Sequence, residues 1–144
     1  MVAVAIIGLM ISITLPAVKK VRGMAMKSEY MNDVRVLAAA FEQYSLENGA
    51  WPRTRPPGVL PPEMTGYITG GSWDSPAPFG GLWKWNRNNN RDFSIIMLWL
   101  STPLSAEEMA LMADIDEKID DGARNGGHFR YNNRRIRRFL VRNS

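Results

Sequence analysis

Acidic side chains gather in the C-terminal third of the chain, and among its residues they are the best candidates for binding a metal ion. Residues 107–121 contain seven acids and one Lys. Carboxylate oxygens suit Ca²⁺, which takes six to eight oxygen ligands. The candidate ligands are Asp114, Asp116, Asp120 and Asp121. Their spacing does not fit an EF-hand loop, and Ile115 and Ile119 indicate a helix. We therefore favour a solvated helix face and keep calcium as the alternative.

An Arg-rich stretch follows the acidic one, because residues 124–144 contain seven Arg and no acid. Six of them form a possible phosphate-binding cluster: Arg130, Arg134, Arg135, Arg137, Arg138 and Arg142. Phe129, Tyr131 and Phe139 are interleaved as stacking surfaces, which nucleic-acid binding would use. Pairing with the acidic helix is the simpler interpretation, and it would also join neighbouring subunits, since the two patches have opposite sign. We do not expect nucleic acid as a partner.

Combinations of residues typical of catalysis are scarce. His128 is the only His and the chain has no Cys. The sequence therefore lacks the residue patterns of Ser–His and Cys–His nucleophiles, and it cannot form a thiolate metal site. We interpret His128 as a strand residue beside Phe129. The paired acids belong to an amphipathic helix, where solvation explains them. We expect neither an enzyme nor an organic cofactor.

The acidic and Arg-rich stretches must be positioned by one helix and the strands around it. Ser105 and Glu108 have the spacing of a capping box, in which each side chain satisfies a backbone N–H, so a helix is expected from Ser105 to Gly122. Residues 127–131 and 136–142 are predicted to form the last strand pair. The Arg residues blur its alternation.

A first hairpin is expected before that helix. Residues 82–86 place two Trp on one face and Lys84 on the other, which predicts a half-buried strand. Residues 93–100 are apolar at nearly every position and suit a central strand. The Asn- and Arg-rich residues 86–91 between them are predicted to form the turn of an antiparallel pair.

Residues 49–80 contain seven of the nine Pro and six of the twelve Gly, a density that predicts a structured loop. Eight side chains could anchor this loop to a core: Trp51, Val59, Leu60, Met64, Tyr67, Ile68, Trp73 and Phe79.

The N-terminal residues 1–18 carry no charge. As a helix they would be about 27 Å long, close to the ~30 Å hydrocarbon core of a bilayer. A cleaved signal would need a basic start and a cleavage site, and a buried core helix is not typical of such a run at a terminus. We predict a transmembrane helix over residues 1–18.

Residues 19–48 are predicted to continue the same helix without a break. Apolar residues recur there at spacings of three, four and seven, which mark one helix face, and polar residues occupy the rest. Gly49 and Pro52 predict the end of the helix. The remaining residues, 49–144, form one small globular head.

This N-terminal pattern resembles the helix of type IV pilins and type II secretion pseudopilins. The similar string is VAVAIIGLMISITLPAVKKVR, with Gly8 and Pro16 eight residues apart and a basic pair behind them. Residues 44–52 resemble the helix-to-loop junction of the major pseudopilin, and residues 114–122 with 129–131 resemble later parts of such chains. The resemblance implies an α+β, pilin-like fold: a long N-terminal helix, with an apolar membrane half and an amphipathic outer half, packed on a small antiparallel sheet.

The resemblance also implies a function. The chain would be a structural subunit of a type II secretion pseudopilus or type IV pilus-like filament used for protein secretion, held in the bacterial inner membrane with its head in the periplasm before assembly. Its partners would be further copies of itself in a filament, other pseudopilins, the inner-membrane assembly platform and membrane lipid. The residues expected in the membrane and assembly helix are Ile6, Ile7, Gly8, Leu9, Ile11, Leu15 and Pro16. Some pseudopilins bind calcium in the region of the four Asp.

Two alternatives stay open: a DNA-binding, competence-type pilin, and a single-pass membrane-anchored binding module without a filament.

The family's processing site, a Gly followed by an aromatic residue and an apolar stretch ending in Glu, is not in the printed sequence. Lys19, Lys20 and Arg22 follow the apolar run and would favour a cytoplasmic head. A periplasmic head therefore leads us to expect translation to start upstream of Met1, with a basic segment and the processing site.

Overall fold

The protein is described by a computed structural model, which covers residues 2–68, 72–88 and 93–141, with only the backbone for residues 2–19. Its first element is the helix α1 (Val2–Asn48). The helix ends at Gly49, which has a φ of +68° and whose N–H donates to the carbonyl oxygen of Ser45 at 2.9 Å. Gly adopts this left-handed conformation without the Cβ penalty of other residues. The predicted single helix ending at Asn48 is confirmed.

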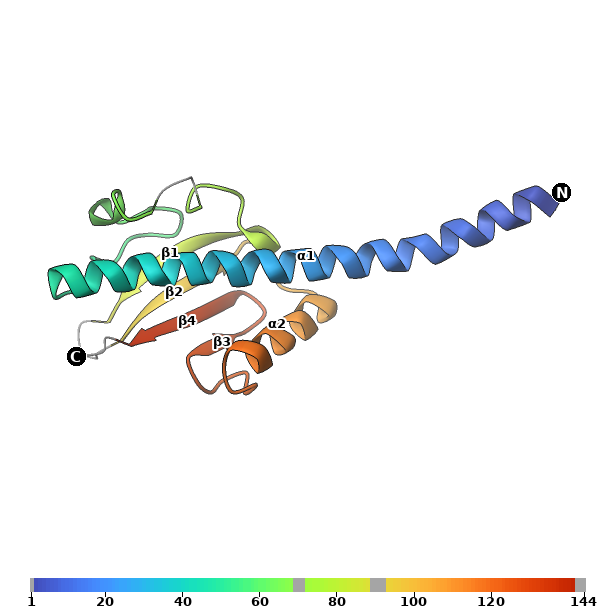
Figure 1. Ribbon diagram of the computed structural model, residues 1–144. Coiled ribbons are helices and arrows are strands. Elements are labelled where there is room, and N and C mark those ends of the chain that lie inside the picture. Colours follow the sequence, from blue (N-terminus) through green and yellow to red (C-terminus); the bar gives the residue numbers. More distant parts are fainter. Residues whose placement is uncertain (1, 69–71, 89–92, 142–144) are drawn as a thin grey trace.

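A four-stranded antiparallel sheet packs against the second half of α1 (Figure 1). Its strands are β1 (Gly81–Arg87), β2 (Phe93–Leu100), β3 (Phe129–Tyr131) and β4 (Arg135–Val141), in the spatial order β1-β2-β4-β3. The helix α2 (Ala106–Ile119) leads from β2 to β3 and packs against α1 and β3. The predicted α+β architecture, with a long helix on a small antiparallel sheet, is confirmed.

The core lies between α1 and one face of the sheet. Phe41 stacks on Trp85 with ring centroids 3.9 Å apart, and Tyr30 stacks on Trp83 at 6.0 Å. The α1 residues in this core recur at spacings of three and four, as expected for one face of a helix. They are Tyr30, Val34, Leu37, Ala40 and Phe41.

The Pro- and Gly-rich segment runs along the outer edge of β1. The N–H of Gly58 donates to the carbonyl oxygen of Trp83 at 2.8 Å, so the loop covers part of an edge that could otherwise pair with another chain. This segment contains the short 3₁₀ helices η1 (Pro62–Met64) and η2 (Pro78–Gly80). Trp51, Met64 and Trp73 are buried as expected, whereas the expectation for Val59 is wrong, because this side chain is exposed.

The membrane prediction falls on residues 1–18, which lie outside the residues whose side chains are described. The same holds for its residues Ile6, Ile7, Gly8, Leu9, Ile11, Leu15 and Pro16. Within the described residues, no helix combines the length and apolar character needed to cross a membrane.

Candidate functional site

The acidic residues are positioned by α2 and by the way this helix ends. The hydroxyl of Ser105 accepts the N–H of Glu108 at 3.2 Å, and the Glu108 carboxylate accepts the N–H of Ser105 at 2.8 Å, which confirms the capping box. At the other end Asp120 leaves the helical conformation (φ −147°, ψ −137°), and Gly122 follows with a φ of +72°. The chain therefore turns sharply where the acids are densest.

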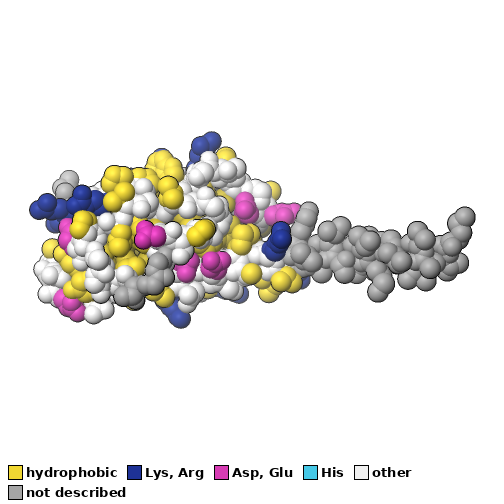
Figure 2. Space-filling view, turned by 90° about the horizontal axis from the view of Figure 1, so that it is seen from above, with side chains coloured by type: hydrophobic (Ala, Val, Ile, Leu, Met, Phe, Trp, Pro, Cys, Tyr) yellow, Lys and Arg dark blue, Asp and Glu magenta, His cyan; other side chains and the backbone are white. Residues whose placement is uncertain are grey.

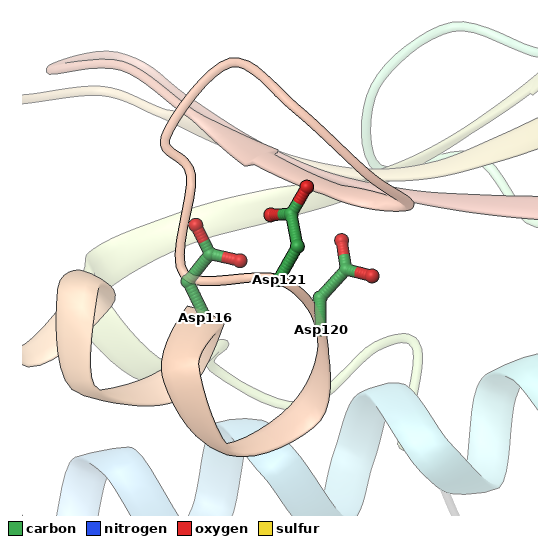
Figure 3. Close-up of side chains that lie close together, drawn as sticks. All are labelled: Asp116, Asp120 and Asp121. Carbon is green, nitrogen blue, oxygen red and sulfur yellow. The ribbon is translucent and has the colours of Figure 1, made fainter.

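This turn brings three carboxylates together at the end of α2, on the side facing the loop to β3 (Figure 3). One oxygen from each of Asp116, Asp120 and Asp121 lies within 4.8 Å of the other two. Asp120 accepts the N–H of Phe129 at 2.6 Å, and Asp121 accepts the N–H of Ala123 at 2.8 Å. Two of the acids therefore also fix the loop that follows the helix.

The Asp116 carboxylate is the unusual member of this cluster. Its residue is fully buried, and no donor among the described residues, the nearby N–H of Gly122 included, has hydrogen-bond geometry to either of its side-chain oxygens. Burial first, and then the charges of Asp121 and Asp120, raise the pKa of Asp116, which the nearby backbone N–H of Gly122 offsets only in part. A buried carboxylate without a partner is costly, so this group needs a proton or a cation.

Two glycines give the carboxylates their space. A Cβ at Gly127 would overlap the carboxylate of Asp120, and a Cβ at Gly126 would lie 2.6 Å from an oxygen of Asp121. Gly127 also has a φ of +53°, which other residues rarely adopt. The sequence predicted a strand from residue 127, and nothing in its pattern indicated that the acids lie against these glycines.

The fourth predicted ligand, Asp114, lies outside the cluster of three. Its carboxylate is 3.5 Å from the ammonium group of Lys27 on α1. A helix turns by about 100° per residue, so Asp114 and Asp116 project in directions that differ by about 160°. The cluster that the structure forms is therefore Asp116, Asp120 and Asp121.

His128 lies beside this cluster but contributes little to it. Its side chain is more than half exposed, and its Nδ1 is 3.9 Å from Asp120. We predicted a strand residue, whereas β3 begins one residue later, at Phe129, although the carbonyl oxygen of His128 already accepts the N–H of Phe139 on β4 at 2.7 Å.

The Arg residues do not pair with α2 as expected. Among the described residues, the ion pairs are Lys27–Asp114 and His128–Asp120, and neither involves an Arg. The reason is strand alternation: Arg130, Arg135 and Arg137 occupy the sheet face opposite the core, whereas Met112 and Ile115 of α2 belong to the core. The expected charge pairing within one chain is therefore wrong.

No family model, curated protein or solved structure matches the chain. The functional argument therefore depends on α1, on the Asp cluster and on the sheet.

Proposed function

We propose that the chain is a structural subunit of a filament of the type II secretion pseudopilus or type IV pilus kind, and that it assembles through α1. The observation that supports this most is the way α1 is used: the stretch between Tyr30 and Phe41 holds the head, and the helix continues beyond the head toward Val2 (Figure 1). Its 47 residues span about 70 Å at ~1.5 Å per residue. A helix that extends well beyond its own core is suited to pack with other copies.

A second feature of α1 supports the same proposal. Four large apolar side chains on this helix are exposed: Val21, Met24, Val36 and Leu46. At about 100° per residue they fall within one arc of roughly 120°, on the side of α1 opposite its core residues. Burial of this face against α1 of neighbouring copies would remove apolar surface from water.

The mechanism that we propose is assembly. The subunit waits in the inner membrane with its head in the periplasm, held by residues 1–18. An inner-membrane platform then transfers it into the filament, where the apolar helices of many copies, and of related subunits, form the centre.

Matched substitutions at two exposed valines test this proposal. Val36 lies on the outer face of α1 with an exposed fraction of 45%, and Val59 lies in the loop with 46%. Val36→Arg should lower the fraction of the full chain in large membrane complexes on native gels, whereas Val59→Arg should leave it unchanged. A wild-type chain that stays monomeric in the membrane would instead support a membrane-anchored module.

We further propose that the Asp cluster binds Ca²⁺, and that this ion stabilises the head. The supporting observation is the buried, unpartnered carboxylate of Asp116, which lies beside two further carboxylates. Asp116, Asp120 and Asp121 would hold the ion, with further oxygens from the backbone or water, because Ca²⁺ prefers six to eight hard oxygen ligands. The ion would neutralise like charges that otherwise repel across the turn.

A further inference from the structure

The sheet face opposite the core carries cations and aromatic rings in ordered rows. Strand register places Lys84, Met97, Arg137 and Arg130 side by side across all four strands. The next row contains Leu82, Trp99 and Arg135. We call these residues, together with Phe139, the cationic sheet face. The register thus joins Lys84 and Trp99 to the Arg-rich stretch, which the sequence alone could not do.

The cations of this face lie on the rings beside them. The guanidinium carbon of Arg135 is 4.2 Å from the centroid of Trp99, and that of Arg130 is 4.7 Å from Phe139. Lys84 also approaches Trp99, at 5.5 Å. At two positions on this face a planar guanidinium group therefore lies over an aromatic ring.

The positive charge of this face is not neutralised within the head. Among its described strand residues none is acidic, and no described carboxylate lies within 4.0 Å of its Arg or Lys groups. Burial, and then the charges of Arg135 and Arg130, lower the pKa of Arg137. The Nε–H of Arg137 is buried, and no described group accepts a hydrogen bond from it. Like charges held this close together favour an anionic partner.

The face is also accessible. Leu82 and Trp99 are exposed, and the buried side chains of the same strands belong to the opposite, core face. Met97 is the exception, since it is buried, and strand register places it between Lys84 and Arg137.

We infer that the cationic sheet face binds single-stranded nucleic acid, with phosphates on Lys84, Arg130, Arg135 and Arg137 and bases on Trp99 and the guanidinium planes. Charge complementarity requires a polyanion. The rings favour a nucleic acid over an acidic protein surface, because every base has a face that stacks on an aromatic ring or an Arg. The site is on the head, so the inference does not depend on filament assembly.

The test measures the salt dependence of binding. The full chain in non-ionic detergent is titrated into a fluorescein-labelled oligodeoxythymidine of about 20 nucleotides, and anisotropy is followed between about 50 and 200 mM NaCl. Four phosphate contacts predict a slope of log K against log salt near −2.8, equivalent to a loss of about 50-fold over that range. The double variant R130Q/R137Q should reduce the slope to about −1.4.

Control variants separate binding at this face from non-specific electrostatic attraction between the basic protein and the oligonucleotide. The double variant R35Q/R53Q removes the same charge from exposed positions elsewhere and should leave the slope unchanged. Trp99→Leu should lower affinity by roughly 5- to 150-fold without changing the slope, because stacking carries no counterion release. If R130Q/R137Q does not show a cooperative melt, K84Q/R135Q makes the same test, because it also removes two of the four proposed phosphate contacts.

Three results would overturn the inference. They are no binding at the lowest salt, an equal loss of slope in R35Q/R53Q, and competition by polyglutamate as effective as by unlabelled oligonucleotide with Trp99→Leu unaffected. The last result would assign the face to an acidic protein surface.

Discussion

Replacing Asp116 by Asn separates the cost of its charge from its use as a ligand. One oxygen of Asp116 lies within 4.8 Å of an oxygen of Asp120, and at that distance two unit charges repel by about 3.5 kcal/mol at an effective dielectric constant near 20. Solvent screens part of this repulsion. In the presence of a chelator such as EDTA, we therefore expect Asp116→Asn to raise the free energy of unfolding by roughly 1–3 kcal/mol.

Calcium should remove most or all of the advantage of Asp116→Asn, because only the wild-type protein keeps the buried ligand. At a free Ca²⁺ concentration of about 100 times Kd, binding stabilises the wild-type head by about 2.7 kcal/mol. For a domain of this size that is a rise in Tm of roughly 10–20 °C. Asp116→Asn removes the buried ligand and should lose most of this rise. Thermal unfolding followed by Trp fluorescence, in EDTA and in CaCl₂, measures both effects.

The pH dependence in EDTA has a definite sign. The pKa of Asp116 is raised by burial and by its acidic neighbours, from about 3.9 in the unfolded chain. Between these values the folded state holds a proton that the unfolded state has released, so stability falls as pH rises through this window and is constant above it. Saturating Ca²⁺ should remove this loss, and Asp116→Asn should not show it.

Asp114→Asn is the matched control, because this acid is on the same helix but pairs with Lys27. It should keep the full response to Ca²⁺. A wild-type Tm that does not respond to Ca²⁺, or an Asp116→Asn variant equally destabilised in EDTA and in Ca²⁺, would refute the cation site.

Three further predictions concern the head. Deleting residues 1–22 should leave a soluble domain with a cooperative melt, because the core face of α1 remains; aggregation would contradict that boundary. Phe41→Ala should cost about 3–5 kcal/mol in urea unfolding, since this buried ring stacks on Trp85. Gly127→Ala should lower Tm more than Gly49→Ala, because both have a positive φ but only Gly127 lies against a carboxylate; equal losses would show that only the backbone matters.

The helices and strands were predictable because their signals are local. The end of α1 follows from Gly49, the start of α2 from the Ser105 capping box, and β2 from its apolar run. The order of the strands is not local: β4 pairs with β2, which leaves β3 at the edge, and nothing in the sequence pattern indicates this.

Which residues form the Asp cluster and the cationic sheet face depends on three-dimensional geometry that the spacing of residues in the sequence does not give. Four acids were equivalent as candidates, and only the turn at Asp120 shows which three converge. The Arg residues were expected to face the acidic helix, but adjacent strand residues point to opposite faces, so Arg137 and Arg138 separate. Long-range register, rather than composition, decides which charges meet.

Disulfide cross-linking within α1 tests the filament proposal most directly. The chain has no Cys, so single substitutions along residues 6–15 introduce unique thiols. We predict that Leu9→Cys gives disulfide-linked dimers of the full chain in membranes after mild oxidation, whereas Arg53→Cys, on an exposed loop, does not. If no position between residues 6 and 15 cross-links while the chain is in the membrane fraction, α1 does not assemble copies, and the central claim is wrong.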